Sequence, residues 1–320
     1  MNVLVTGGAG LIGSVVSTAL INRGYTPIII DSLAAGDRRF LKNRLGYVTD
    51  ICDIEFIIGI VKKYHIKSCI HLAAKISVEE SVRDPLLYYK ENVAKSIKLF
   101  EALKRNNVNK IIFSSSASVY DASKNFEVTE ESPLNPLSPY ANTKMIMEMI
   151  LKDSVSETFK AISLRYFNLI GACKSGFSGP YDDNPSHLLG MLIKAKKENK
   201  PFTIFGDDWG TRDKTTIRDF IHVQDLADAH VLALDKFEEV TRDKNYEVIN
   251  LGTGKGTTVK EFVSAFIKVA GEIEVKYEKR RAGDVIGAYT NTQKAEELLG
   301  FKAKYSIEEG IEDTFKWLEK

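Results

Sequence analysis

A glycine-rich turn near the start of the chain restricts the possible folds more than any other feature. Residues 2–6 form a short apolar run, and after the turn residues 11–22 carry apolar side chains at helical spacing. Such a strand–turn–helix unit brings the backbone close to a pyrophosphate at the positive end of the helix. The turn fits G-x-G-x-x-G and the related G-x-x-G-x-x-G with Gly7, Gly8, Gly10 and Gly13. It therefore predicts a dinucleotide-binding α/β fold, with a ligand-free glycine turn as the alternative.

An acidic residue after the second apolar run indicates which dinucleotide is bound. Residues 27–30 are apolar and are followed by Asp31, 18 positions after Gly13. A carboxylate at this place accepts hydrogen bonds from the diol of an adenine ribose, and it repels a 2′-phosphate. The sequence therefore favours NAD over NADP as the cofactor.

The first half of the chain alternates between apolar strands and helical segments. Strands are expected at residues 46–49, 68–72, 110–113 and 161–166, and helices at residues 53–64 and 84–105. This alternation predicts an α/β protein with a parallel, doubly wound, Rossmann-like sheet. Because the alternation lapses after residue 168, we expect an NAD-binding domain over residues 1–167 and a second, smaller α/β domain over residues 168–320.

The second domain is expected to hold the substrate. Residues 171–185 are rich in Gly, Pro, Ser and Asp and form too long a connection for an ordinary loop, which indicates a substrate-binding segment. One strand, residues 246–251, is expected to rejoin the large sheet. Helices are expected at residues 186–199, 225–237, 259–270 and 307–318.

A serine–proline pair marks the start of a helix with a chemically useful face. Ser138 is a suitable N-cap, and Pro139 fits the first helical position, where its missing N–H is not needed. Tyr140 and Lys144 lie four residues apart, so the phenol and the ammonium rise from the same face. An adjacent cation lowers the pKa of a phenol from about 10 towards neutrality, which would make Tyr140 a general base.

Hydroxyl side chains follow the strand at residues 110–113. In a parallel sheet such residues lie at the carboxyl ends of the strands, where ligands bind. Ser116 or Ser118 is therefore placed to meet Tyr140, with a plain serine-rich turn as the alternative.

The nearly equal numbers of basic and acidic residues indicate which kind of ligand the protein binds. The 320 residues carry 44 basic and 43 acidic side chains, so nucleic acid and anionic membranes are disfavoured and a small-molecule ligand is favoured. Cys52, Cys69 and Cys173 have neither disulfide nor zinc spacing, so we expect no metal. The first residues have the pattern of a strand instead of a signal peptide, and no apolar run reaches the roughly 18 residues of a membrane span. We therefore expect a cytoplasmic protein.

Several motifs together resemble the extended short-chain dehydrogenase/reductase family. They are TGGAGLIG (6–13), SSSASVY (114–120), Tyr140-x-x-x-Lys144, LRYFN (164–168), RDFIHV-x-DLA (218–227) and RRAGD (280–284). Within the family the chain is most similar to the UDP-glucose 4-epimerases, and the likeness runs almost from end to end. The resemblance implies an isomerase with tightly bound NAD, which interconverts UDP-glucose and UDP-galactose through a transient 4-keto sugar.

The resemblance also implies which residues form each part of the site. Tyr140 is the expected base, Lys144 keeps its pKa low and holds the nicotinamide ribose, and Ser116 bonds the reacting oxygen. The residues expected to contact NAD are Gly7, Gly10, Ile12, Gly13, Asp31, Asp50, Ile51, Lys75, Asn92, Tyr140 and Lys144. The residues expected to contact the UDP-sugar are Ser116, Tyr140, Asn168, Leu188, Arg218, Arg281, Asp284 and Ala288. The forked donors of the two arginines suit a diphosphate, with surface ion pairs as the alternative.

Ala288 bears on the range of sugars. In the family, the residue at this place borders the sugar pocket, and its bulk limits the substituent at C2. A small Ala288 therefore implies that N-acetylated UDP-hexoses are accepted as well, unless Tyr289 fills the space.

The resemblance is imperfect around the expected uridine diphosphate. Ser186-His187 stands where the family usually has Asn-Asn, Phe220 replaces a Tyr, and Asp121 replaces a Gly. Ser116-Ala117-Ser118 lacks the carboxylates of related sugar dehydratases and decarboxylases, so only oxidation and reduction are supported. The open alternatives are a UDP-glucuronate 4-epimerase, a nucleotide-sugar oxidoreductase that uses free NAD, and a non-catalytic NAD-sensing regulator.

The resemblance implies a symmetric homodimer. We expect its interface on the helix near residues 85–105 and on the helix that starts at Pro139, because their apolar side chains exceed what one sheet face needs. These side chains are Leu99, Phe100, Leu103, Met145 and Met149.

Overall fold

The computed structural model describes residues 1–121, 126–182, 185–281 and 284–320. Its largest element is a seven-stranded sheet with the order β12-β7-β5-β4-β1-β2-β3, in which all neighbours are parallel. The strands are β1 (Asn2–Thr6), β2 (Thr26–Asp31), β3 (Leu45–Val48), β4 (Ser68–His71), β5 (Lys110–Ser114), β7 (Lys160–Tyr166) and β12 (Tyr246–Leu251). This confirms the predicted doubly wound α/β sheet and the return of residues 246–251 to it. The strand order reverses between β1 and β4, where such sheets bind their ligands.

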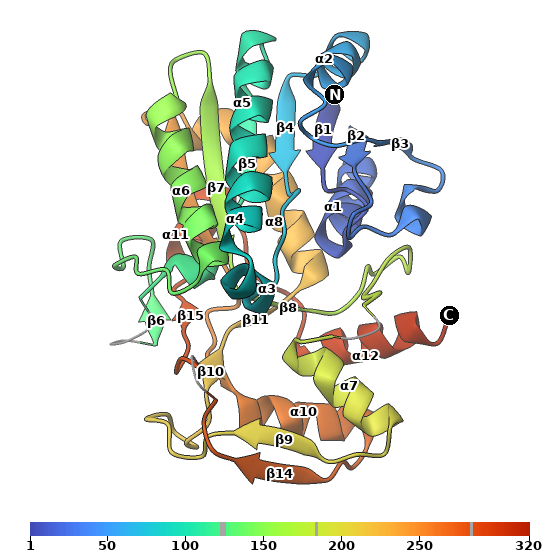
Figure 1. Cartoon of the computed structure of the whole chain (residues 1–320), viewed down its shortest axis with the longest axis vertical. Helices are drawn as coiled ribbons and strands as arrows, with labels where there is room; N and C mark the ends of the chain where they lie inside the picture. Colours follow the sequence, from blue (N-terminus) through green and yellow to red (C-terminus); the bar gives the residue numbers. More distant parts are fainter. Residues whose placement is uncertain (122–125, 183–184, 282–283) are drawn as a thin grey trace.

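Helices cover both faces of this sheet (Figure 1). One face is covered by α1 (Leu11–Asn22), α8 (Val223–Asp235) and α11 (Gln293–Leu299), and the other by α2 (Ile54–Lys63), α5 (Lys95–Arg105) and α6 (Pro139–Ser154). A strand buried on both sides needs apolar residues at every position. In β1, Val3 and Val5 accordingly belong to one core and Leu4 to the other.

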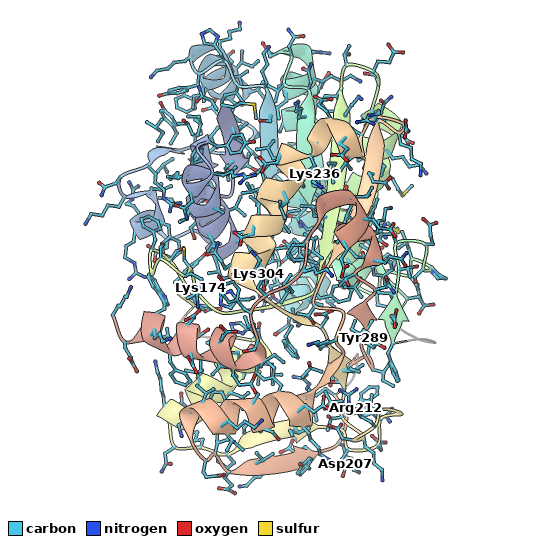
Figure 2. The ribbon with its side chains drawn as sticks, turned by 180° about the vertical axis from the view of Figure 1, so that it is seen from behind. Lys174, Asp207, Arg212, Lys236, Tyr289 and Lys304 are labelled. Atoms are coloured by element: carbon cyan, nitrogen blue, oxygen red, sulfur yellow. The ribbon has the colours of Figure 1, made fainter. Side chains whose placement is uncertain are left out.

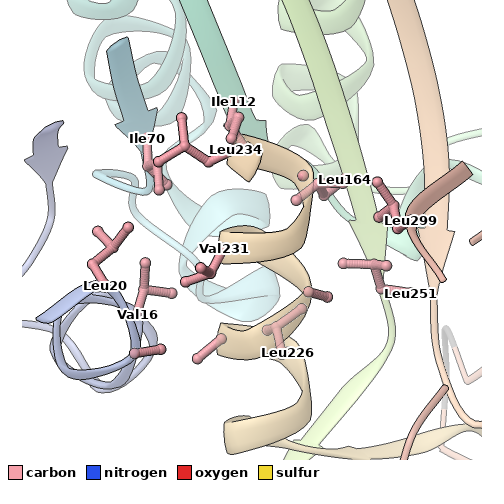
Figure 3. Packing of buried hydrophobic residues seen from close by; sticks show 14 of the residues in the cluster. Val16, Leu20, Ile70, Ile112, Leu164, Leu226, Val231, Leu234, Leu251 and Leu299 are labelled. Carbon is pink, nitrogen blue, oxygen red and sulfur yellow. The ribbon is translucent and has the colours of Figure 1, made fainter. Parts of the chain in front are cut away.

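The packing of α1 against α8 joins distant parts of the chain. Figure 3 shows Val16 and Leu20 of α1 beside Val231 of α8, all buried in one core. Leu234, near the end of α8, packs between Ile70 and Ile112 of the sheet. A helix from the second half of the sequence therefore completes the core of the first half.

A smaller lobe lies below the large sheet (Figure 1). It contains the parallel strands β9 (Phe202–Phe205) and β14 (Val275–Glu278), with α7 (Leu188–Lys197), α10 (Val259–Ala270) and α12 (Ile307–Leu318). Its core is separate, and within it the rings of Phe220 and Phe262 are 4.3 Å apart. The division of the chain at residues 167 and 168 stays a prediction.

Short strand pairs connect the two parts. They are β8 (Asn168–Ile170) with β11 (Phe220–His222), β10 (Ile217–Arg218) with β13 (Thr257–Thr258), and β6 (Glu127–Val128) with β15 (Tyr289–Thr290). Figure 2 shows Tyr289 of β15 between the large sheet and the smaller lobe. Residues predicted to bind the substrate lie on or next to these pairs.

The predicted helix over residues 84–105 is present but is not regular. It consists of α4 (Pro85–Tyr88), a π-helical turn over Tyr89–Ala94 and α5. π-helical turns are frequent at functional sites, and this one carries Asn92. The remaining helices are α3 (Val78–Arg83), α9 (Phe237–Val240), and the 3₁₀ turns Arg38–Leu41 and Ala117–Val119.

Leu99, Phe100 and Leu103 of α5 were predicted to lie at a dimer interface, and this prediction is wrong. Leu99, Phe100 and Leu103 are at most 5% exposed, because this face of the helix covers the sheet. Ile97 of α5 is 40% exposed, and Met149 of α6 is 56% exposed. Among the described residues, no helix combines the length and the apolar character that crossing a bilayer requires.

Candidate active site

The glycine turn between β1 and α1 has no room for side chains. Gly7 has a φ of +70°, and a Cβ there would lie 2.7 Å from the backbone nitrogen of Ala73. A Cβ on Gly13 would lie 2.2 Å from the carbonyl oxygen of Gly7. Gly10 is the N-cap of α1 and has no side chain to accept the N–H groups of the first turn, such as that of Ile12. The turn leaves a positive helix end open to an anion, and this geometry fits the pyrophosphate of NAD.

Asp31 ends β2 beside this turn. Its carboxylate accepts hydrogen bonds from the N–H groups of Ala9 (2.9 Å) and Leu33 (2.8 Å). Asp50 and Ile51 follow β3, the neighbouring strand, and therefore lie at the same edge of the sheet. The contacts of these three residues with NAD stay predictions, but their placement at one edge agrees with them.

Asn92 joins the segment after β4 to α6 through hydrogen bonds. Its side chain accepts a hydrogen bond from the N–H of Lys75 (2.8 Å) and donates to the Lys75 carbonyl (2.9 Å) and the Thr143 hydroxyl (3.1 Å). The Lys75 ammonium is paired with Glu80 at 3.0 Å. The two predicted cofactor contacts, Lys75 and Asn92, therefore form one unit, and Thr143 joins it to α6 between Tyr140 and Lys144.

The start of α6 confirms the predicted cap and the pairing of Tyr140 with Lys144. Ser138 accepts a hydrogen bond from the N–H of Ala141 at 3.2 Å. The Lys144 ammonium lies 5.9 Å from the centre of the Tyr140 ring, and both side chains are buried. The ammonium donates to the carbonyl of Ser114 at 2.7 Å.

Ser116 is the serine that meets the phenol. Its hydroxyl lowers the pKa of the Tyr140 phenol, while Ser118 donates to Ser116 from its N–H (3.2 Å) and its hydroxyl (3.0 Å). Ser118 thus holds Ser116 in place. Of the two candidates that the sequence left open, the structure brings Ser116 to Tyr140.

The expected lowering of the Tyr140 pKa by Lys144 stays a prediction. In this structure burial raises the pKa of Tyr140, and the Ser116 hydroxyl offsets only part of this rise. Burial also lowers the pKa of Lys144 to about 8, although the charge of Glu148 opposes it. Both shifts have the same cause, because the fold removes water from the phenol and from the ammonium.

Sequence reasoning missed the acid behind Lys144. Glu148 forms a buried ion pair with Arg165 of β7, with an Nη2–Oε2 distance of 2.5 Å. Arg165 also donates to the hydroxyl of Tyr120 at 2.8 Å. The signal was present in the sequence, because Glu148 follows Lys144 by four residues and so lies on the same helix face.

The residues predicted to bind the diphosphate come together at the smaller lobe. Arg218 donates to the carbonyls of Ile217 (2.7 Å), Ile286 (3.1 Å) and Val285 (3.2 Å). Burial lowers its pKa, and Asp284 and Arg281 act on it through their charges. Arg281 and Asp284 are joined by two hydrogen bonds of 3.1 Å. Ala282 and Gly283 of the same motif, like Asp183 and Asn184 of the predicted substrate segment, lie outside the described residues.

Ala288 packs against a small buried cluster of Val119, Tyr120 and Val128. Ala117, the neighbour of Ser116, and Phe167, the neighbour of Asn168, pack against the same cluster. The ring of Tyr289 lies instead against Gly256, where a Cβ would be 2.4 Å from it.

Leu188, another predicted contact, is the first residue of α7. His187, at a place where the family usually has Asn, is the N-cap of this helix and accepts a hydrogen bond from the N–H of Gly190 at 3.1 Å. The substituted residue therefore keeps a capping role.

With a bound nicotinamide, these groups could support the oxidation and reduction of an alcohol. The buried Tyr140 and Lys144 and the adjacent Ser116 lie at the edge of the large sheet, and Arg218 and Arg281 have donors suited to an anion. Within the described residues, no group of three or more His, Cys, Asp or Glu side chains is arranged to hold a metal ion.

Comparisons with known proteins agree with this chemistry. A model of the NAD dependent epimerase/dehydratase family matches residues 3–252. UDP-glucose 4-epimerase 1 of Oryza sativa subsp. japonica is 39% identical over 99% of this chain and 94% of that protein, and UDP-glucose 4-epimerase of Bacillus subtilis (strain 168) is 38% identical over 99% and 96%.

Two solved structures extend the likeness to the whole fold. UDP-glucose-4-epimerase from Stenotrophomonas maltophila, with bound NAD and formylated UDP-arabinopyranose, superposes with a TM-score of 0.94 at 35% identity over 100% of this chain and 98% of that one. The UDP-Glc/GlcNAc 4-epimerase from Campylobacter jejuni gives a TM-score of 0.85 at 33% identity over 99% of both chains.

Proposed function

The chain belongs to the NAD-dependent epimerase/dehydratase family, and from this premise we propose that it is an isomerase, a UDP-hexose 4-epimerase. It interconverts UDP-glucose and UDP-galactose through a transient 4-keto sugar, with NAD as its cofactor. The observation that carries the proposal is the buried pair of Tyr140 and Lys144 on α6, with the Ser116 hydroxyl beside the phenol. The relatives named above are epimerases of this kind by name.

The residues that would hold NAD are the glycine turn over residues 7–13, Asp31, and Lys144 at the ribose of the nicotinamide. When bound there, NAD would supply the hydride chemistry at C4 of the sugar. Tyr140 removes the proton of the 4-hydroxyl and later returns it. Ser116 donates a hydrogen bond to the reacting oxygen and so stabilises the charge that develops there.

In the proposed reaction, Lys144 counteracts the raised pKa of Tyr140. A buried phenol loses its proton at neutral pH only when a positive charge is close, and Lys144 is the cation that α6 provides beside it. Arg218 and Arg281 bind the diphosphate of the substrate, for which their forked donors are suited. Both roles are part of the proposal.

The same site accepts N-acetylated UDP-hexoses. In support, Ala288 is small, and the Tyr289 ring lies against Gly256. One of the structural neighbours is named for both plain and N-acetylated substrates.

We also propose a symmetric homodimer in the cytoplasm. In support, α3, α4, α5 and α6 each carry an exposed apolar side chain, namely Val82 (64% exposed), Leu86 (79%), Ile97 (40%) and Met149 (56%), and exposed apolar surface can mark an association site. The three free cysteines suit a reducing compartment.

A product assay with a panel of UDP-sugars tests the function. The purified protein should convert UDP-glucose and UDP-galactose into each other without added NAD and without releasing NADH, and denatured protein should release nicotinamide. Stoichiometric NADH formation would instead support an oxidoreductase, and conversion of UDP-glucuronate alone would support the uronate epimerase. Absence of any turnover would leave the non-catalytic alternative.

A further inference from the structure

A buried row of polar groups lies behind the catalytic helix and has no role in the proposed reaction. Arg165 of β7 contacts both carboxylate oxygens of Glu148 at 2.5–3.2 Å, and the two side chains are only 5% and 6% exposed. The hydroxyl of Tyr120 accepts from Arg165 at 2.8 Å and donates to Asn250 at 2.6 Å. The row thus spans α6, β7, the segment after β5 and the edge strand β12.

One further contact joins this row to the catalytic loop. The hydroxyl of Ser115 donates to Glu148, and its backbone N–H donates to the carbonyl of Leu164 at 2.9 Å. Ser115 stands between Ser114, whose carbonyl accepts a hydrogen bond from the Lys144 ammonium, and Ser116, whose hydroxyl acts on the Tyr140 phenol. Whatever fixes Ser115 therefore fixes both neighbours.

Glu148 is also anchored to the other half of the site. It lies on α6 one turn after Lys144, which is itself one turn after Tyr140. A single carboxylate thus contacts the loop that carries Ser116 and is carried by the helix that bears Tyr140 and Lys144.

A buried ion pair is not an efficient way to stabilise a core. Removing two charges from water costs free energy that their attraction only partly returns, and apolar residues of similar volume are often as stable or more stable. Fully bonded polar networks do, however, define one geometry, because each donor and acceptor has a fixed direction. We therefore expect the ion pair to fix the geometry next to the reacting groups and not to stabilise the fold.

We propose that Glu148 and Arg165 are positioning residues, which hold the Ser114–Ser116 segment in register with α6 so that Lys144 and Ser116 meet Tyr140. This inference rests on the proposed epimerase function. It assigns to neither residue a contact with substrate or cofactor.

Glu148→Gln tests the proposal, because it keeps the shape of the side chain and removes its charge. A displacement of about 1 Å at reacting groups can cost about 100-fold in rate, so we expect kcat to fall by up to about 100-fold while KM changes little. Glu247→Gln is the matched control. Glu247 of β12 pairs with Lys294 at 2.7 Å and is 15% exposed, so its substitution also breaks a partly buried pair, and kcat should stay at the wild-type value.

Two further variants distinguish a positioning role of the Glu148–Arg165 pair from a contribution to the stability of the fold. Glu148→Met/Arg165→Met replaces the pair by apolar side chains and should fold with a near wild-type melting temperature, yet kcat should remain low. Ser115→Ala leaves the ion pair whole and breaks only its link to the loop, so kcat should fall by about tenfold, the loss of one hydrogen bond.

The outcomes that overturn the inference are distinct. Recovery of wild-type kcat in the double Met variant would show that the pair only stabilises the fold. If kcat of Ser115→Ala or Glu148→Gln is within about threefold of wild type, the ion pair does not hold the Ser114–Ser116 segment in register with α6. Wild-type protein without epimerase activity would overturn the proposed function and this inference with it, whereas active wild type with equally active variants would overturn this inference alone.

Discussion

Replacing Lys144 should stabilise the fold while it abolishes activity. Lys144 is 4% exposed, and burial lowers its pKa from 10.5 to about 8. At about 1.4 kcal/mol per pH unit, holding its charge in the folded protein costs about 3 kcal/mol. Lys144→Met keeps the volume and removes the charge, but it leaves the Ser114 carbonyl without its donor, which costs about 1 kcal/mol. We expect a net gain of about 2 kcal/mol in the free energy of unfolding at pH 7.

The stability difference between Lys144→Met and wild type should depend on pH. The folded state binds the Lys144 proton less tightly than the unfolded state does, so the penalty is complete below about pH 8 and disappears as the pH rises towards 10.5. The stability advantage of Lys144→Met should therefore shrink over that interval. Urea unfolding at several pH values measures it, with the nucleotide content of each preparation determined, because a ligand that binds only the folded state adds stability.

Lys95→Met serves as the control. The carboxylates of Asp50 and Glu91 raise the pKa of Lys95, so its removal should destabilise the protein at neutral pH. A Lys144→Met variant that is less stable than wild type at pH 7, or whose advantage does not change with pH, would refute the argument that burial of this charge is costly.

Three other outcomes are expected. Tyr140→Phe should fold and retain NAD but lose at least about 100-fold in kcat in the product assay, and near-normal turnover would contradict the assignment of the base. Gly13→Ala should purify without nicotinamide, because its Cβ would lie 2.2 Å from the Gly7 carbonyl oxygen, and nicotinamide at the wild-type ratio after denaturation would contradict the tight turn. Ala288→Tyr should reduce kcat/KM for UDP-N-acetylgalactosamine by about 10- to 100-fold, the effect of roughly 1–3 kcal/mol of overlap, and leave UDP-galactose unaffected, whereas equal losses on both sugars would argue against a gate at this residue.

The features that the sequence predicted correctly are those fixed by local backbone chemistry. Gly7 and Gly13 permit contacts that no other residue allows, and Ser138 with Pro139 suits only the first turn of a helix. The predicted return of residues 246–251 to the sheet is confirmed, because β12 pairs with β7 over its whole length. The family motifs then placed Arg218, Arg281 and Asp284 in one group, as found.

The features that the sequence did not predict depend on the tertiary surroundings. An amphipathic pattern shows that Leu99 and Phe100 share a face, but the pattern does not tell a sheet from a second subunit. The spacing of Tyr140 and Lys144 was correct, whereas the direction of the Tyr140 pKa depends on how completely the fold removes water from the phenol. The π-helical turn around Asn92 likewise has no signature in the sequence that helical spacing could detect.

The interleaving of the two halves also determines how this protein can be made. During synthesis the ribosome releases residues 1–167 first, but α8 and β12 leave it much later. Until then Val16 and Leu20 lack their partner helix, and β7 is an unpaired sheet edge, a form that invites aggregation. The nascent chain therefore reaches a stable fold only after most of it has been translated, and a gene fragment that ends at residue 167 is a poor candidate for separate expression.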